Sequence, residues 1–324
     1  MVGERESGMD ELRARFQAKA QAGGDPAEAC ALAQAVRAGD PAAARELAAL
    51  WLHAAAAGPE RLVPTYDGAA EGWLGAPPKA MMLEAAAEPL PIPQDFWSGF
   101  WALATEPRAG PDPGEITQRT AALAAKLDPG FRDRAAAMAW RYPGVRDAAA
   151  AGYPARFTLE TLAQAPAGSL GHEFHSLIVD NGFDLEVLDR EALGLADLPA
   201  PLNYLNARIL QCHDLWHIAA GYQTTALHEV AISGFQAGQF GHGYSALFLA
   251  MVLTRAAFAQ PEAAGLFLDT ILVAWTHGRE SPPLLGLDWP AIWGLPTAEV
   301  RTSIGLAPYA SPYPADLFEQ LRAA

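Results

Sequence analysis

The stretch 211–221 constrains this chain more than any other, because it places an acid and two histidines within five consecutive residues. His213 and His217 are four positions apart, so on a helix they lie one above the other on the same face. Asp214 lies within about a quarter turn of both on that helix. Gly221 is expected to end the helix, because glycine weakens a helix interior and favours a turn.

A second acid, Glu229, follows in a segment over 226–232 that has the pattern of a new helix. On one continuous helix Glu229 would lie about 120° around from His217, so a break at Gly221 is needed to bring it back. Imidazole nitrogen and carboxylate oxygen together suit zinc, manganese, cobalt or ferrous iron. We therefore predict a divalent metal site, with zinc expected and iron, manganese or cobalt as alternatives. The predicted metal ligands are His213, Asp214, His217 and Glu229. The alternative is that the two histidines are simply satisfied side chains on a buried helix.

Helix signals dominate the rest of the chain, and strand signals are scarce, so we predict an all-α fold, a multi-helix bundle with the metal-binding helix at its centre. Asp25-Pro26 and Asp40-Pro41 each indicate a helix start, with aspartate as the cap and proline in the first turn. Residues 1–24 show no regular pattern, and we expect disorder at their start.

We predict three parts in the chain. Residues 1–58 form an N-terminal helical hairpin extension, and residues 95–324 form the metal-binding helical domain. Residues 59–94 are rich in glycine and proline, so we expect a linker there with at most one helical turn, around 80–88.

Charge and composition exclude several classes of function. The net charge of −15 and a pI near 4.9 argue against nucleic-acid binding and against general electrostatic attachment to anionic lipid. The two cysteines, Cys30 and Cys212, give no disulfide framework and fit a reducing compartment. Early acidic residues argue against an organelle transit peptide, and no apolar run reaches the ~20 residues of a spanning helix. We expect a soluble, bacterial, cytoplasmic protein.

The metal motif, His-Asp-x-x-His followed by eleven residues and glutamate, resembles that of the coenzyme Q (ubiquinone) biosynthesis protein 4 family. Three further stretches resemble the family in the same order: the Gly-Ser-Leu-Gly segment at 166–171, Trp-Thr-His-Gly-Arg at 275–279, and the C-terminal helix at 288–301. The resemblance covers roughly 95–308. His172-Glu-Phe-His175 departs from the family pattern, and the first ~90 residues have no counterpart in its core.

The resemblance implies a ubiquinone biosynthesis enzyme, a metal-dependent decarboxylase (lyase) that removes the C1 carboxylate of a polyprenylated 4-hydroxybenzoate-type ring, either alone or coupled to hydroxylation at C1. It also implies a homodimer, other quinone biosynthesis proteins as partners, a polyprenyl-phenolic small molecule as ligand, and peripheral contact with the inner face of a bacterial membrane. Two alternatives stay open: a non-catalytic, lipid-binding organiser of the quinone biosynthetic complex, and a metallohydrolase.

Two further residues are candidates for catalysis. His242 lies between two glycines, which would let a ligand or the metal approach closely, and we assign it to proton delivery, with a helix cap as the alternative. Arg279 ends a predicted helix, where it either clamps a substrate carboxylate or simply favours the helix dipole. The stripe Tyr244, Phe248 and Met251 is either core or the wall of an apolar channel.

Overall fold

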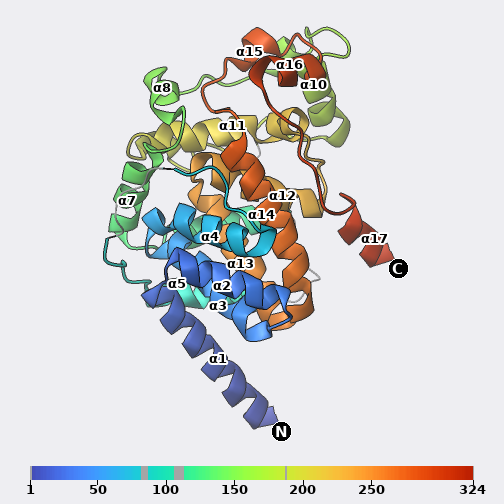
Figure 1. Ribbon diagram of the computed structural model, residues 1–324. Coiled ribbons are helices and arrows are strands. Elements are labelled where there is room, and N and C mark those ends of the chain that lie inside the picture. The colour runs from blue at the N-terminus through green and yellow to red at the C-terminus, as the bar shows by residue number, and fades with distance from the viewer. Residues whose placement is uncertain (1, 82–86, 106–112, 187, 324) are drawn as a thin grey trace.

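Helices make up all of the regular structure in the computed structural model, which describes residues 2–81, 87–105, 113–186 and 188–323 (Figure 1). No strand occurs among these residues, which confirms the predicted all-α class. The α-helices are α1 (Val2–Ala22), α2 (Pro26–Arg37), α3 (Pro41–Ala56), α4 (Leu62–Leu74), α5 (Gln94–Thr105), α6 (Pro113–Ala124), α7 (Pro129–Ala139), α8 (Val145–Ala150), α9 (Leu159–Leu162), α10 (Leu170–Asn181), α11 (Leu202–Ala220), α12 (Ala226–Phe240), α13 (Gly243–Ala259), α14 (Ala264–Glu280), α15 (Trp289–Ile292), α16 (Thr297–Ile304) and α17 (Leu317–Ala323). Short 3-10 turns are η1 (Pro59–Arg61), η2 (Leu195–Asp197) and η3 (Pro261–Ala263).

Aspartate caps start α2 and α3 where the sequence predicted. The Asp25 carboxylate accepts the Glu28 backbone N–H at 2.8 Å, and the Asp40 carboxylate accepts the Ala42 N–H at 2.8 Å. Each cap satisfies an N–H that has no partner inside the helix, and the proline that follows needs no such partner.

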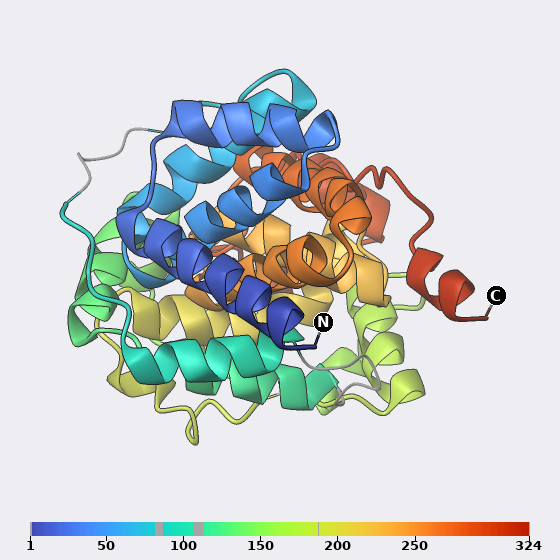
Figure 2. The same cartoon turned by 90° about the horizontal axis from the view of Figure 1, so that it is seen from below.

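The centre of the molecule is built from α12, α13 and α14, which pack against one another. The N-terminal helices cover this centre: α3 lies on α13, α4 lies on α14, and α2 packs against α3 and α4, as Figure 2 shows from below. Tyr66 of α4 stacks on Trp51 of α3 and contacts Trp275 of α14, with ring centroids 4.2 and 4.7 Å apart. The predicted division into 1–58, 59–94 and 95–324 stays a prediction; in the structure the three parts share one core.

Two segments differ from what the sequence indicated. Residues 2–22 form α1, which is anchored by Phe16, only 3% exposed, against Phe100 and Trp101 at 5.9 and 5.3 Å between ring centroids. The expected linker contains α4, although part of the helical turn predicted around 80–88 lies outside the described residues.

The proline and glycines of 62–74 led the sequence analysis to expect a linker, but each lies at a position of α4 where a helix tolerates it. Pro64 lies in the first turn, where a backbone N–H has no helical partner to lose. Gly68 and Gly72 face the backbone carbonyls of Pro26 and Cys30, and a Cβ at either glycine would collide with them. These glycines therefore allow α2 and α4 to pack closely, and the cost of glycine in a helix is offset by that contact.

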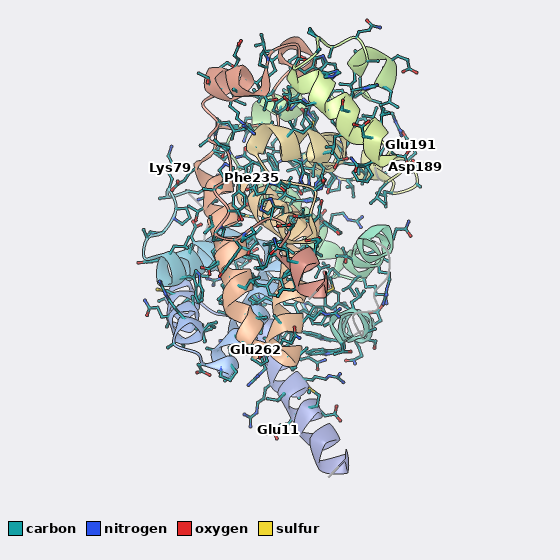
Figure 3. The ribbon with its side chains drawn as sticks, turned by 90° about the vertical axis from the view of Figure 1, so that its right-hand side faces the viewer. Glu11, Lys79, Asp189, Glu191, Phe235 and Glu262 are labelled. Atoms are coloured by element: carbon teal, nitrogen blue, oxygen red, sulfur yellow. The ribbon has the colours of Figure 1, made fainter. Side chains whose placement is uncertain are left out.

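Helix α12 approaches α14 equally closely through glycine. A Cβ on Gly238 would lie 2.6 Å from the Trp275 carbonyl oxygen, and one on Gly278 would collide with the Phe235 carbonyl oxygen. Figure 3 shows Phe235 inside the body, whereas the charged residues Glu11, Asp189 and Glu262 lie at its periphery. Within the described ranges, every helix is too short or too polar to cross a lipid bilayer.

Candidate metal centre

Helix α11 carries the two histidines of the motif on one face. Their Nε2 atoms lie 3.2 Å apart, and the rings meet edge to face at an interplanar angle of 72°. The helix ends at Gly221, whose φ of 83° is a left-handed conformation that glycine adopts without steric cost. The His217 carbonyl oxygen accepts the backbone N–H groups of Gly221 and Tyr222 at 3.1 and 2.8 Å, which closes the predicted break.

Helix α12 then brings Glu229 back to both rings. One carboxylate oxygen, Oε2, lies 3.3 Å from His213 Nε2, and the other, Oε1, lies 3.3 Å from His217 Nε2. Glu229 sits in the first turn of α12, so the interruption between α11 and α12 is what allows this approach. His213, His217 and Glu229 thus form a triangle of side chains, with contacts of 3.2, 3.3 and 3.3 Å, in which Glu229 uses a different carboxylate oxygen for each histidine.

Asp214 joins the two histidines in a group whose ligand atoms all lie within 4.8 Å of one another. This His-Asp-His group could hold a metal ion. The structure therefore brings all four residues that the sequence singled out to one place, three through direct contacts with one another and Asp214 beside them.

The hydrogen bond of His217 leaves one ring nitrogen available to a cation. His217 Nδ1 lies 3.2 Å from the carbonyl oxygen of Gln223, which can only accept, so Nδ1 carries the proton and Nε2 presents a lone pair. That lone pair lies 3.3 Å from a carboxylate oxygen of Glu229, and either a proton or a metal ion between the two atoms makes the contact favourable. A divalent metal bound between His217 and Glu229 would also take His213 Nε2 as a ligand. Ligands bound tetrahedrally at about 2.0 to 2.1 Å would lie roughly 3.3 Å apart, which fits the triangle.

Burial and charge act against each other in the cluster. Burial alone would raise the pKa of Glu229, but hydrogen bonds and charge from His213 and His217 lower it well below its ordinary value. Burial would lower the pKa of His213, yet Glu229 and Asp214 raise it. The side chain of His217 is 1% exposed and that of Glu229 is 46% exposed, so the centre is open to solvent on the side of Glu229.

His242 occupies the N-cap position of α13 without a side-chain capping hydrogen bond, and its ring does not contact the triangle directly. Its Nδ1 lies 2.9 Å from the Ser245 hydroxyl, which donates to Gln236 Oε1 at 3.3 Å, and Gln236 Nε2 lies 2.8 Å from His213 Nδ1. Sequence reasoning missed Gln236 and Ser245. One signal could have found Gln236: it follows Glu229 by seven residues, which is close to two helical turns on the same face.

Arg279 is engaged elsewhere. Its guanidinium donates to the Asp67 carboxylate of α4 at 3.3 and 3.4 Å and to the Lys79 carbonyl oxygen at 2.9 Å. Burial raises the pKa of Asp67 although Arg279 and the Trp275 indole N–H oppose that shift. The proposed clamp on a substrate carboxylate stays a prediction; in the structure Arg279 holds a carboxylate of its own chain.

Other singled-out residues lie outside the triangle. Burial raises the pKa of the Cys212 thiol to about 12, so it is a neutral core residue on α11. His228 Nδ1 accepts the Gln223 N–H at 2.8 Å and so holds the same loop residue whose carbonyl oxygen bonds His217.

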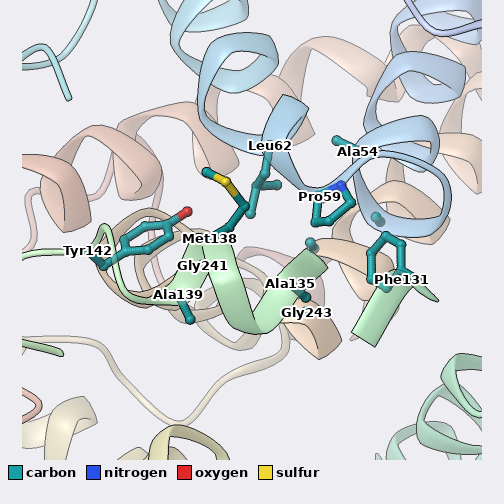
Figure 4. A pocket seen from close by; sticks show the side chains of 12 residues that line it. Ala54, Pro59, Leu62, Phe131, Ala135, Met138, Ala139, Tyr142, Gly241 and Gly243 are labelled. Atoms are coloured by element: carbon teal, nitrogen blue, oxygen red, sulfur yellow. The ribbon is translucent and has the colours of Figure 1, made fainter. Parts of the chain in front are cut away.

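A small apolar pocket lies beside the turn that carries His242 (Figure 4). Gly241 and Gly243 contribute to it from the α12–α13 turn, and Leu62 of α4, Met138 of α7 and Tyr142 line it from other elements. The pocket therefore lies where the N-terminal helices meet the helices that carry the cluster. The predicted stripe of Tyr244, Phe248 and Met251 is not part of its lining.

Comparison with known proteins gives a consistent picture for the C-terminal half. Residues 154–310 match the family model described as "Coenzyme Q (ubiquinone) biosynthesis protein Coq4". The chain is similar to the mitochondrial ubiquinone biosynthesis protein COQ4 of Eremothecium gossypii, with 26% identity over 150 residues, 46% of this chain and 44% of the relative. It is similar to the COQ4 homolog of Rattus norvegicus, with 27% identity over 155 residues, 46% of this chain and 55% of the relative.

The chain thus spans about half the length of the curated relatives it matches. A crystal structure of a protein from Nostoc punctiforme, named for ubiquinone biosynthesis, aligns with a TM-score of 0.49 at 19% identity, over 65% of this chain and 94% of that one. A likeness at that level does not bear on function. The matched range contains the complete His-Asp-x-x-His and Glu229 cluster, so the similarity to the coenzyme Q (ubiquinone) biosynthesis protein 4 family covers the residues of the candidate metal centre.

Proposed function

We propose that this protein acts in ubiquinone biosynthesis as a metal-dependent decarboxylase that removes the C1 carboxylate of a polyprenylated 4-hydroxybenzoate-type ring. The observation that carries the proposal is the convergence of His213, His217 and Glu229, at 3.2 to 3.3 Å, inside the range that matches the family. The names of the relatives, which place those proteins in ubiquinone biosynthesis, support the same role.

His213, His217 and Glu229 would hold the metal, with Asp214 as a further ligand or as the group that orients a histidine. When bound, a divalent metal would supply Lewis-acid polarisation of a substrate oxygen. We propose zinc, with iron, manganese and cobalt as alternatives, because two imidazoles and carboxylate oxygens suit all four ions.

The side chains of this chain would bind and orient the substrate. Glu229 is the most exposed of the three contacting side chains, so a phenolic substrate would enter from its side. The hydroxyl para to the carboxylate can donate electron density to C1, so that a proton adds there and carbon dioxide then leaves. In the oxidative version, the acid, dioxygen and water give a C1 hydroxyl group, carbon dioxide and hydrogen peroxide. Three hydrogen bonds, through Gln236 and Ser245, connect His242 to the ring of His213. His242 would therefore act through this series of hydrogen bonds and would not contact C1.

The proposed function also bears on location, oligomeric state and partner proteins. We propose a cytoplasmic protein that contacts the inner face of a bacterial membrane peripherally, forms a homodimer, and works with other quinone biosynthesis proteins, because a polyprenyl tail confines the substrate to a membrane. These points rest on the family resemblance and on the chemistry of the substrate.

The test is release of labelled carbon dioxide from a precursor that carries carbon-13 in its C1 carboxylate, measured together with metal content. Wild-type protein should bind about one divalent metal ion and release label, and His217→Ala should lose both. His172→Ala, on the exposed face of α10, is the matched control and should keep both. Decarboxylation that persists in His217→Ala would refute the proposal.

Each alternative predicts a different result in the same experiment. A non-catalytic organiser would bind metal and co-purify with the lipid precursor but release no label. A metallohydrolase would release no label and would cleave esters, peptides or phosphoesters.

A further inference from the structure

A chain of four polar side chains runs from the cluster into the core between α12 and α13. His213 Nδ1 lies 2.8 Å from Gln236 Nε2, Gln236 Oε1 accepts from Ser245 at 3.3 Å, and Ser245 Oγ lies 2.9 Å from His242 Nδ1. Gln236 is 2% exposed, Ser245 is 0% and His242 is 8%, so water cannot readily replace these bonds. Each bond must therefore be made by the side chains themselves.

The Gln236 amide decides the direction of every bond in this chain. Its nitrogen only donates and its oxygen only accepts, and rotating the amide by half a turn exchanges the two within the same space. With the nitrogen against His213, Nδ1 of that ring must accept, so the ring proton sits on Nε2 and blocks it as a ligand. Ser245 then donates to the amide oxygen, and His242 must donate from Nδ1 to Ser245.

The reversed amide has the opposite consequences. His213 Nδ1–H donates to Gln236 Oε1, which leaves Nε2 of His213 free to bind a metal. The amide nitrogen then donates to Ser245, the Ser245 hydroxyl donates to His242 Nδ1, and the proton of His242 moves to Nε2. Each ring keeps the same number of protons in the two amide orientations. The proton of His213 moves from Nε2 to Nδ1, and the proton of His242 moves from Nδ1 to Nε2.

We propose that Gln236 is a positioning residue of the metal centre, which frees His213 Nε2 for the metal by accepting from Nδ1 and thereby couples metal binding to the tautomer of His242. This inference rests on the proposed metal centre and adds to it two residues, Gln236 and Ser245. Metal-bound histidines generally donate their other ring N–H to an oxygen acceptor, and His217 already does so to the Gln223 carbonyl oxygen.

His242 is suited to report the coupling because it stays neutral. Burial lowers the pKa of His242 to about 3, with the nearby His213 adding to the effect. Near neutral pH this imidazole therefore has one proton on one of two nitrogens, and the Ser245 hydroxyl determines which.

The first measurement is zinc affinity by competition with a chelator, beside the melting temperature of the metal-free protein. Gln236→Leu removes the acceptor and should weaken zinc binding by roughly 10- to 100-fold. Gln236→Glu keeps an acceptor oxygen and should restore affinity to within a few-fold of wild type. Gln239→Leu is the matched control, because this glutamine is buried on the same helix but bonds the Gly278 carbonyl oxygen and the Leu284 N–H. It should lower the melting temperature and leave zinc affinity unchanged.

The second measurement is the nitrogen-15 NMR spectrum of histidine-labelled protein, in which protonated and unprotonated ring nitrogens are distinct. The His242 signals are assigned by their loss in His242→Gln. In wild type, zinc should move the His242 proton from Nδ1 to Nε2. In Gln236→Glu the carboxylate accepts from both neighbours, so Ser245 must accept from His242, whose proton should stay on Nδ1 with or without zinc.

The outcomes separate this inference from the proposal it rests on. Wild-type zinc affinity in Gln236→Leu, or a His242 tautomer that ignores zinc in wild type, would overturn the inference while the metal centre stands. Wild-type protein that binds no zinc, iron, manganese or cobalt would overturn the metal centre and this inference together.

Discussion

Oε1 of Glu229 lies 3.3 Å from Nε2 of His217, although the two residues belong to different helices with a left-handed glycine between them. The contact depends on the direction change at Gly221, whose own backbone N–H bonds the His217 carbonyl oxygen at 3.1 Å. A backbone feature and a side-chain cluster are therefore linked through one residue, His217.

Replacing the Glu229 carboxylate by an amide should weaken metal binding strongly. In Glu229→Gln the anionic oxygen that faces both imidazoles is lost, so affinity should fall by more than the roughly 10- to 100-fold typical of an outer-sphere partner. Isothermal titration with zinc measures the change. Glu262→Gln, on the exposed η3 turn, is the control for loss of one negative charge and should bind as wild type does. Equal affinities for the two variants would remove Glu229 from the ligand set.

Metal removal should destabilise the junction between α11 and α12. A metal present at about 100 times its dissociation constant stabilises the native state by about 2.7 kcal/mol, so chelation should lower the melting temperature by a few degrees. The effect should vanish in His217→Ala, which cannot complete the triangle. A chelator that lowers both melting temperatures equally would point to a metal bound elsewhere.

The cluster was predictable because its members are close in sequence and obey helical geometry. His213 and His217 need only the four-residue repeat, and Gly221 indicates the break that frees Glu229. Gln236 also lies at a helical spacing from Glu229, but a single glutamine on an apolar helix does not indicate a site by itself. Its role can be inferred only from the structure, in which α13 places Ser245 beside it.

Long-range partners could not be found in this way. Arg279 bonds Asp67, which is 212 residues away, and no local pattern connects the two. Helix α4 was missed for a related reason: Gly68 and Gly72 lower helix propensity, and their compensation is close contact with the backbone of α2, which only the tertiary structure supplies.

Acid should destabilise the protein through His53, a buried residue of α3. Burial lowers the pKa of His53, whose Nδ1 lies 2.8 Å from the Ala20 carbonyl oxygen. Below the ordinary value of about 6.5, the unfolded chain binds a proton that the native state does not, so stability falls as pH falls, by up to about 1.4 kcal/mol per pH unit, until the lowered native value is reached. The contribution of His53 to the free energy of unfolding is fully present above about pH 6.5.

The measurement for His53 is the free energy of unfolding in urea at pH 7.5 and pH 5, on metal-free protein. His53→Asn cannot take up the proton, so its stability should fall less than that of wild type between the two pH values. The variant is expected to be less stable than wild type at pH 7.5, since it fills the buried site less well. Parallel pH profiles for the two proteins would rule out His53 as a source of the acid sensitivity.

The close approach of α12 and α14 should be intolerant of a single added methyl group. In Gly278→Ala the new Cβ meets the backbone carbonyl of Phe235, which cannot rotate away as a side chain would, so the helices must separate. We expect a loss of about 1 to 3 kcal/mol in the free energy of unfolding, typical of an overpacked core. Because α12 carries both Glu229 and Gln236, zinc affinity should fall as well. Gly265→Ala on the same helix is the matched control: its Cβ would lie 3.6 Å from the Trp73 ring, an ordinary contact, and alanine should be neutral or slightly stabilising. Equal stability of the two variants would show that α12 and α14 can move apart at little cost.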